Sequence, residues 1–333
     1  MTNEADELRR RREELDALDH DLLDLLAKRI DAIREIVSEK KANKALPIRD
    51  EQREREIFDR WANAASQRNL SPYFVGRILR EILTYSRHYQ ESVLRPGPAG
   101  NEDSSQPLKV AYQGIRGSYS DQAVRKLFPE DADHVIDPIG FPSFTAAVDA
   151  LERGEVDFAL LPIENSIAGS INETYELLLH RNVPIVGEEI LKIEHRLLGL
   201  PGASIHDLKR VLSHPVALVQ CSRFLSSLPS TIAEGHEDTA AAAEEVARSG
   251  DRSIAAIASE AAARAYGLEI LREDIADQSE NYTRFVLVST KPAVADRRLP
   301  CKTSLVLRTN HEKGALVHCL QTLVEHDINM SKL

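Results

Sequence analysis

Cationic side chains interrupt a long apolar pattern near the start of the chain. Residues 4–45 contain neither proline nor glycine, and a leucine or isoleucine recurs every seven residues, except that Arg29 takes one of these places. A buried cation without a partner is costly, so this arginine predicts a helical bundle built around a bound anion. The alternative is a polar residue that sets the register of a coiled coil.

Lys40 and Arg12 extend the same pattern. Arg29 and Lys40 are eleven residues apart, which on an α-helix places them ~20° apart around the axis and ~16 Å apart along it. Both side chains can therefore reach one small molecule. Arg12 is ~25 Å from Arg29 along the axis. If Arg12 serves the same ligand, it must come from a second copy of the chain, which would also cover a seam about 60 Å long.

Further polar residues follow this helix. Asp50, Arg53 and Glu54 follow Pro47 and lie within about one helical turn of each other. Ser86 and Gln90 are one turn apart at the end of the helical region. For the charged run alone, a solvated helix face with ion pairs one turn apart is the simpler interpretation.

Four polar motifs lie in the second part of the chain, three of them where a strand-like run ends and the fourth where the last strand begins. They occupy residues 112–120, 161–166, 213–215 and 281–285. Ligands in open α/β sheets bind beyond the strand ends, and a helix that begins near Ser118 and Ser120 could hold a carboxylate. Taken singly, each motif is better explained as a turn or a helix cap.

The elements that carry these residues change type at a linker. Residues 96–107 are rich in proline, glycine and serine, and 291–302 form a second spacer, so we predict domains at 1–95, 108–290 and 303–333. The first domain is helical, with shorter helices at 50–67 and 71–91. The second domain alternates strands and helices, which predicts a largely parallel α/β sheet. The expected strands are 109–112, 158–161, 183–186, 211–213, 253–257 and 284–288, with helices at 143–153, 171–181, 215–228 and 239–249.

Composition excludes several classes of protein. The net charge of -11 argues against nonspecific nucleic-acid binding. No apolar run is long enough to span a membrane, and the first ten residues lack the apolar core of a signal peptide. Cys221, Cys301 and Cys319 are widely spaced, which favours a reducing compartment and neither a disulfide framework nor a zinc site. We therefore expect a cytoplasmic protein.

Residues 8–92 resemble the all-helical chorismate mutase family, through L-R-R-R-R-E-E-L-D-A-L-D, A-K-R-I, P-I-R-D-x-x-R-E-R and S-R-H-Y-Q. The resemblance implies an intertwined helical homodimer that converts chorismate to prephenate by a pericyclic rearrangement without a cofactor. Such an enzyme holds the dianion in a compact conformer and stabilises charge on the breaking ether bond. The implied site consists of Arg12 from the partner subunit, Arg29, Lys40, Asp50, Arg53, Glu54, Ser86 and Gln90.

Residues 108–289 resemble prephenate dehydratase, through Y-Q-G-I-R-G-S-Y-S, L-P-I-E-N-S-I-A-G-S-I-N, S-H-P and N-Y-T-R-F. The resemblance implies two α/β lobes with a cleft between them, in which prephenate loses carbon dioxide and hydroxide to give phenylpyruvate. It makes Thr283 the essential residue. A threonine hydroxyl is a poor proton source at neutral pH, so we expect it to hydrogen-bond the leaving oxygen, and to act as a general acid only if its setting permits. The candidates for substrate binding are Glu164, Asn165, Ser166, Ser213, His214, Arg284 and Phe285.

Residues 312–317 resemble the regulatory ACT domain of this family, a ferredoxin-like α+β unit that binds phenylalanine. Gly314, Ala315, Leu316 and Val317 match its G-A-L-V element, but its E-S-R-P stretch is absent. We therefore expect a partial domain at 303–333, with strands at 303–307 and from 328, and weak control by phenylalanine. The terminal S-K-L is then a point of truncation and no peroxisomal address.

Two rival functions remain open at this stage. An arogenate dehydratase would use the same chemistry on a substrate that carries an amino group, although an attached mutase favours prephenate. A ligand-sensing protein is the alternative without catalysis, since two-lobed α/β clefts also bind solutes. No metal or organic cofactor is expected for any of these functions.

Overall fold

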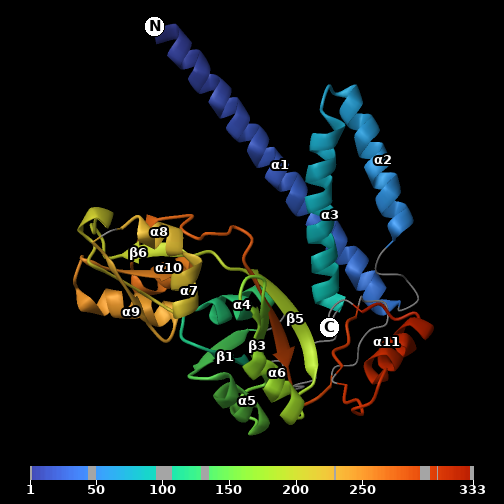
Figure 1. The fold of residues 1–333 in the computed structure, drawn as a ribbon. Coiled ribbons are helices and arrows are strands. Elements are labelled where there is room, and N and C mark those ends of the chain that lie inside the picture. Colours follow the sequence, from blue (N-terminus) through green and yellow to red (C-terminus); the bar gives the residue numbers. More distant parts are fainter. Residues whose placement is uncertain are drawn as a thin grey trace. The chain divides into compact units, whose positions relative to one another are not determined.

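The structure is a computed structural model, which describes residues 2–43, 50–94, 107–128, 135–228, 230–292, 301–305 and 307–330. The chain divides into two compact units, one built mainly from residues 1–100 and the other from residues 101–292 and 303–333 (Figure 1). The predicted linkers at 96–107 and 291–302 lie almost entirely outside the described residues. The exact domain boundaries therefore stay predictions.

The first unit consists of α1 (Thr2–Ala42), α2 (Glu51–Gln67) and α3 (Pro72–Leu94), close to the predicted positions. The Asp50 carboxylate caps α2 by accepting a hydrogen bond from the Arg53 backbone N–H at 2.9 Å. Asn69 adopts a φ of 57° and so turns the chain sharply between α2 and α3. Helix α3 packs against both α1 and α2 (Figure 1).

The two halves of α1 differ in burial. In the C-terminal half, Ile33 and Val37 are buried against Tyr89 and Val93 of α3. In the N-terminal half, the apolar repeat is open to solvent: the side chains that expose more than half of their surface are Leu15, Leu18, Leu22, Leu23 and Leu25. This stripe is an apolar surface that the described part of one chain leaves uncovered.

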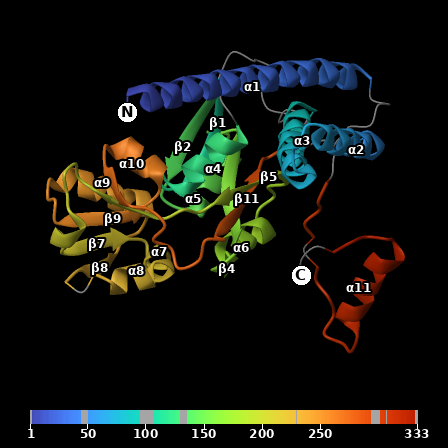
Figure 2. The ribbon, with the colours of Figure 1, turned by 90° about the horizontal axis from the view of Figure 1, so that it is seen from above.

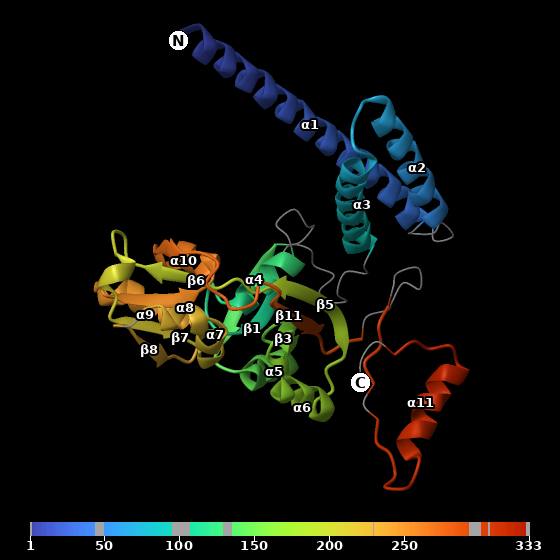
Figure 3. The ribbon, with the colours of Figure 1, turned by 45° about the horizontal axis from the view of Figure 1, so that its top comes forward.

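The second unit has two lobes, each a sheet with helices on both faces. In lobe 1 the strand order is β2-β1-β3-β11-β5, and the short β4 (Gly169–Ser170) pairs with β3. The other bounds are β1 (Leu108–Gln113), β2 (Ile136–Phe141), β3 (Phe158–Asn165), β5 (Ile185–Lys192) and β11 (Tyr282–Val288). Alternate strand residues point to opposite faces. Helices α5 (Phe144–Glu152) and α6 (Asn172–His180) therefore cover one face, and α4 (Tyr119–Leu127) covers the other (Figure 3).

Lobe 2 has the strand order β10-β6-β9-β7-β8 (Figure 2). Its strands are β6 (Arg196–Gly199), β7 (Arg210–Ser213), β8 (Ile232–Gly235), β9 (Ile254–Ala258) and β10 (Glu269–Arg272). Helices α9 (Thr239–Ser249) and α10 (Glu260–Tyr266) pack on one face, mainly through alanines. Helices α7 (Pro215–Gln220) and α8 (Ser222–Ser226) pack on the other, and a 3-10 turn, η1 (Ile205–Asp207), precedes β7.

The chain enters lobe 2 after β5 and returns to lobe 1 as β11, between β3 and β5 and antiparallel to both. Each sheet is mixed, with parallel pairs on one side and antiparallel pairs on the other. The prediction of a largely parallel sheet is wrong, because the antiparallel pairs of β11 in lobe 1 and of β6 in lobe 2 join segments far apart in the chain and leave no local sequence signal.

Three predicted elements also need correction. The strand expected at 183–186 begins at Ile185 and runs to Lys192. The helix expected at 215–228 breaks at Cys221, because the Asp277 backbone N–H bonds the Gln220 carbonyl and the Asp277 carboxylate caps the start of α8. Residues 303–305 and 328–330 form no strand, and the described residues beyond 300 contain one helix, α11 (Ala315–Glu325). A strand needs a neighbour for its backbone hydrogen bonds, and these segments have none in the described chain.

Candidate active sites

The helical unit brings several predicted site residues together around α3. Arg29 of α1 donates to the Ser86 hydroxyl at 2.6 Å, and Lys40 of α1 donates to the Gln90 side-chain oxygen at 2.9 Å. Ser86 is almost fully buried. Partial burial lowers the pKa of the Arg29 guanidinium, because desolvation disfavours its charged form. Two cations on one face of α1, each hydrogen-bonded to a neutral polar group of α3, are an arrangement suited to binding a small anion.

Glu54 of α2 and Arg87 of α3 form another polar contact of the helical unit. Arg87 of α3 donates to both carboxylate oxygens of Glu54 at 3.1 Å. Arg87 lies inside the S-R-H-Y-Q motif, but the sequence analysis did not select it. The remaining two predicted residues of α2 lie at its start: Asp50 caps the helix, and the exposed Arg53 side chain pairs with Glu56 at 3.4 Å.

Arg12 lies apart from this group, on the exposed N-terminal half of α1. At ~1.5 Å per residue it is ~25 Å from Arg29 along the helix. Arg12 precedes the exposed leucine stripe and lies near the same face of α1, since Leu15 and Leu22 are three and ten residues beyond it.

In the α/β unit, β11 places Thr283 beside Asn165 at the end of β3. The two residues are directly opposite in the antiparallel register, and the Asn165 side-chain amide donates to the Thr283 hydroxyl oxygen at 2.9 Å. Thr283 is buried, with 8% of its surface exposed.

The orientation of the Asn165 amide is fixed by the backbone. Its oxygen accepts hydrogen bonds from the N–H groups of Ile167 and Ala168 at 3.0 and 2.8 Å. Its nitrogen must therefore face Thr283 and Asn281, and it donates to the Asn281 side-chain oxygen at 2.8 Å. Since Thr283 accepts this bond, its own O–H proton remains available to another acceptor.

This contact continues through residues that the sequence analysis missed. The Asn281 amide nitrogen donates to the Gln220 side-chain oxygen at 3.1 Å, and His195 Nε2 lies 2.8 Å from the same oxygen. Tyr119 Oη lies 2.9 Å from His195 Nδ1. Asn281 and Tyr119 lie within the quoted motifs, but Gln220 and His195 belong to none, so only their position in the fold identifies them.

The other candidates for substrate binding have structural contacts. Ser166 pairs with the backbone of Tyr282, and the Ser213 hydroxyl is fully buried and donates to the Ile257 carbonyl at 2.6 Å. Three further candidates hold elements in place: His214 caps α7, Arg284 pairs with Glu188 of β5 at 2.7 Å, and Phe285 packs in the lobe 1 core. Glu164 lies half-buried at the end of β3, next to Asn165. Contact between these residues and a substrate stays a prediction.

The glycine-rich turn between β1 and α4 contacts lobe 2 closely. A Cβ at Gly117 would lie 2.8 Å from the Ala262 Cα, and the Gly117 carbonyl accepts a hydrogen bond from Ser259 at 2.8 Å. A Cβ at Gly114 would lie 3.2 Å from an Asp238 carboxylate oxygen. Burial raises the pKa of Asp238, although two backbone N–H groups of α9 oppose this change. The turn thus requires glycine to join the lobes.

The predicted regulatory residues lie at the start of α11. Gly314 precedes the helix with a φ of 84°, Ala315 begins it, and Leu316 and Val317 expose half or more of their surface. Throughout the described segments, no group of three or more histidine, cysteine, aspartate or glutamate side chains could hold a metal ion. No helix in these segments is long and apolar enough to cross a membrane.

The fold and the two sites define a chain with two catalytic units for small anionic substrates. One unit is helical and carries Arg29 and Lys40 beside polar groups of α3, and the other is a two-lobed α/β unit in which an amide donates to a threonine hydroxyl. Family models agree with this division: chorismate mutase type II matches residues 11–91, and prephenate dehydratase matches residues 110–293.

Individual relatives cover both units. The chain is 35% identical to the bifunctional chorismate mutase/prephenate dehydratase of Escherichia coli strain K12, over 97% of this chain and 82% of that protein. It is 43% identical to arogenate dehydratase 2 of Petunia hybrida, over 68% of this chain and 56% of that protein. The prephenate dehydratase of Arthrobacter aurescens, solved in complex with L-Phe, is 28% identical, with a TM-score of 0.59 over 68% of this chain and 75% of that one.

The chain therefore belongs to the bifunctional chorismate mutase/prephenate dehydratase family. It converts chorismate to prephenate and prephenate to phenylpyruvate in phenylalanine biosynthesis.

Proposed function

We propose that the mutase reaction takes place in the pocket between α1 and α3, with Arg29 and Lys40 as its main cations. The rearrangement needs no nucleophile and no proton transfer, so the pocket has to hold the dianion in its reactive conformer and stabilise negative charge on the ether oxygen. The Arg29 guanidinium suits a carboxylate. Lys40 and Gln90, which are hydrogen-bonded at 2.9 Å, are in a position to share the ether oxygen. Glu54 would accept from the substrate hydroxyl.

We propose further that this pocket is completed by a second copy of the chain. Two observations support a homodimer: the stripe of exposed leucines on the N-terminal half of α1, and the distance of Arg12 from Arg29. An antiparallel or crossed copy of α1 would cover the stripe and bring Arg12 of the partner to Arg29 and Lys40. A contiguous apolar surface of this kind commonly marks an interface between chains.

In the dehydratase, the Thr283 hydroxyl donates a hydrogen bond to the departing hydroxide and so stabilises the negative charge that develops on its oxygen. The bond between the ring and the carboxylate breaks, carbon dioxide leaves, and the electron pair of that bond completes the aromatic ring as the carbon–oxygen bond to the hydroxyl breaks. The observation that carries this role is the hydrogen bond from Asn165 to Thr283 at 2.9 Å, which leaves the threonine proton free for donation. Aromatisation drives the reaction, so a well-placed donor is sufficient assistance.

One experiment with full-length protein tests this proposal. Chorismate is supplied, and prephenate and phenylpyruvate are followed together. In Thr283→Val, which keeps the shape and removes the hydroxyl, we expect prephenate to accumulate at the normal rate while phenylpyruvate formation falls by roughly a hundredfold or more. Thr283→Ser should retain partial activity because it keeps the hydroxyl. Undiminished phenylpyruvate formation by Thr283→Val would exclude Thr283 as the hydrogen-bond donor to the leaving oxygen.

The 43% identity to an arogenate dehydratase supports arogenate as a second possible substrate of the same cleft. Comparing kcat/KM for prephenate and arogenate on the same preparation distinguishes the two. The attached mutase supplies prephenate, so we expect prephenate to be preferred.

A further inference from the structure

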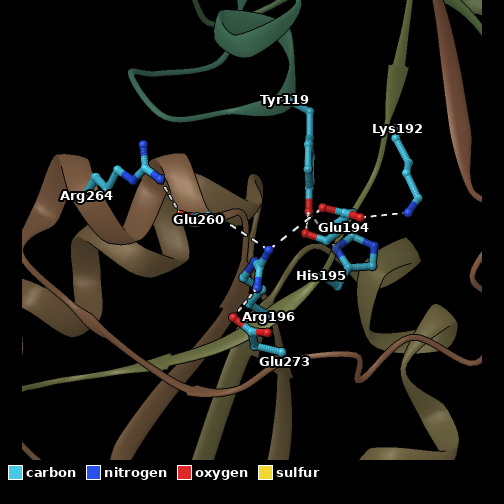
Figure 4. A network of polar contacts seen from close by, with 8 residues as sticks. All are labelled: Tyr119, Lys192, Glu194, His195, Arg196, Glu260, Arg264 and Glu273. Carbon is cyan, nitrogen blue, oxygen red and sulfur yellow. Dashed lines mark hydrogen bonds and ion pairs between the residues drawn. The ribbon is translucent and has the colours of Figure 1, made fainter. Parts of the chain in front are cut away.

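His195 is a buried and Tyr119 a half-buried polar residue, and the reaction itself uses neither. His195 is 4% exposed and lies where the chain crosses from lobe 1 to lobe 2, between β5 and β6. Tyr119 is the first residue of α4 in lobe 1. The two rings meet edge to face with centroids 5.6 Å apart. Figure 4 shows the Tyr119 hydroxyl reaching His195 and the neighbouring Glu194.

The main chain on both sides of His195 is held by ion pairs. Lys192 pairs with Glu194 at 2.7 Å, and Arg196 pairs with Glu273 at 2.6 Å and with Glu260 at 3.2 Å (Figure 4). Because Arg196 is only 16% exposed, its two pairs are more firmly placed than the exposed pair of Lys192 and Glu194. The backbone that carries the His195 imidazole is therefore held mainly on its C-terminal side.

Two backbone N–H groups of lobe 1 determine, through a series of side-chain amides, which group donates to which as far as His195. The Asn165 oxygen is bound by two backbone N–H groups, so its nitrogen donates to the Asn281 oxygen. The Asn281 nitrogen consequently faces Gln220 and donates to its side-chain oxygen. His195 Nε2 lies 2.8 Å from this same oxygen, which can only accept, so Nε2 must carry a proton.

The other ring nitrogen is satisfied by Tyr119. In the neutral ring Nδ1 is an acceptor, and the Tyr119 hydroxyl at 2.9 Å is its donor. Burial lowers the pKa of His195 and raises that of Tyr119 well above its ordinary value, so both groups are neutral at pH 7. The Glu194 carbonyl, 2.8 Å from the same hydroxyl, competes for its single proton.

We infer that His195 and Tyr119 are positioning residues of the dehydratase, which hold the far end of the hydrogen-bond chain that orients Thr283. This inference rests on the proposed role of Thr283. His195 fixes the Gln220 oxygen, Gln220 fixes the Asn281 amide, and Asn281 together with Asn165 sets which side of Thr283 accepts. Since Tyr119 belongs to α4, the chain also ties the helix after the glycine-rich turn to the crossing between the lobes.

The direct test is the tautomer of His195 in the unmodified full-length protein. Long-range proton–nitrogen spectra of histidine-labelled protein at pH 7 distinguish the two neutral tautomers, and the His195 signal is the one absent from His195→Gln. We expect a protonated Nε2 and a bare Nδ1. A protonated Nδ1 with a bare Nε2 would overturn the inference, because the ring could then not donate to Gln220.

Kinetics give the second test. His195→Phe keeps a ring but removes both nitrogens, and we expect dehydratase kcat to fall roughly tenfold, or about 1.4 kcal/mol, with little change in KM, because His195 does not touch substrate. His195→Gln keeps an N–H donor near Nε2 and should retain most of kcat. The mutase activity of the same chain reports whether each variant is intact. Equal loss in both variants would assign His195 a packing role instead.

Tyr119 has a matched control in Tyr266. Both tyrosine hydroxyls lie 2.8 Å from a backbone carbonyl in another part of the second unit, Tyr266 from that of Arg116 and Tyr119 from that of Glu194, but of the two only Tyr119 also contacts His195. Tyr119→Phe should lower kcat severalfold more than Tyr266→Phe. Equal effects would mean that Tyr119 only connects two segments of the unit.

If Thr283→Val were active, the proposed function would fail. If Thr283→Val were inactive and the His195 variants normal, only this inference would fail.

Discussion

Replacing Asn165 by aspartate tests the dehydratase site with almost no change in shape. The backbone N–H groups of Ile167 and Ala168 would still bind one oxygen and would favour the ionised side chain. The second oxygen would take the place of the amide nitrogen, 2.9 Å from the Thr283 oxygen and 2.8 Å from the Asn281 oxygen. The substitution thus places an acceptor oxygen where the Asn165 nitrogen donated to the Thr283 and Asn281 oxygens, so three acceptors face one another.

The Thr283 hydroxyl can relieve this conflict by turning its proton toward the new carboxylate. The proton is then withdrawn from the cleft. Loss of one donor at a developing negative charge lowers kcat by roughly 10²–10³, or about 2.7–4 kcal/mol. We therefore expect Asn165→Asp to lose as much dehydratase activity as Thr283→Val, although it keeps every heavy-atom position.

The assay supplies prephenate to full-length protein at pH 8, where the carboxylate is ionised, and follows phenylpyruvate. Mutase activity on chorismate, measured on the same sample, should stay within about twofold of the unmodified protein, because the site lies in the other unit. The double variant Asn165→Asp/Thr283→Val should be no worse than either single change, since both remove the same hydrogen-bond donor. Asn165→Asp with a kcat within about threefold of normal would refute the reasoning from hydrogen-bond polarity.

The remaining predictions concern the mutase, the joint between the lobes and control. Arg29→Ala and Lys40→Ala should each cost the mutase about 3 kcal/mol or more in transition-state stabilisation while dehydratase activity on supplied prephenate persists; near-normal mutase rates would exclude this pocket. Mixing inactive Arg12→Ala with inactive Lys40→Ala protein should restore some mutase activity after subunit exchange, and no recovery in proven heterodimers would place Arg12 outside a shared site. Gly117→Ala should weaken the dehydratase more than the mutase, because its Cβ would lie 2.8 Å from the Ala262 backbone at a φ of 86°; equal dehydratase rates would mean that the joint can shift freely. Phenylalanine should inhibit this chain weakly, because α11 buries no side chain in the described part of the chain; strong inhibition at low concentration would show that this segment, or another, binds the effector.

Local sequence was sufficient to predict the helical unit and the two cations of α1 that the structure places beside Ser86 and Gln90. Helices of 41 and 23 residues follow from long stretches free of proline, and the Asp50 cap lies where the charged run begins. The i, i+11 spacing of Arg29 and Lys40 places both on one face of α1 whatever the surroundings. Quoted motifs also led to Asn165 and Thr283, which the structure joins at 2.9 Å.

Only the tertiary structure decided how Thr283 is oriented. The hydrogen-bond chain that orients it consists of Asn165 from β3, Asn281 from the return crossing, Gln220 from α7 and His195 from the outward crossing. A single histidine or glutamine has no period and no local signature, so its role depends on which residue lies opposite. That is settled by the insertion of β11 between β3 and β5. The paired residues are 90 or more positions apart in the chain, so no nearby residue fixes the register.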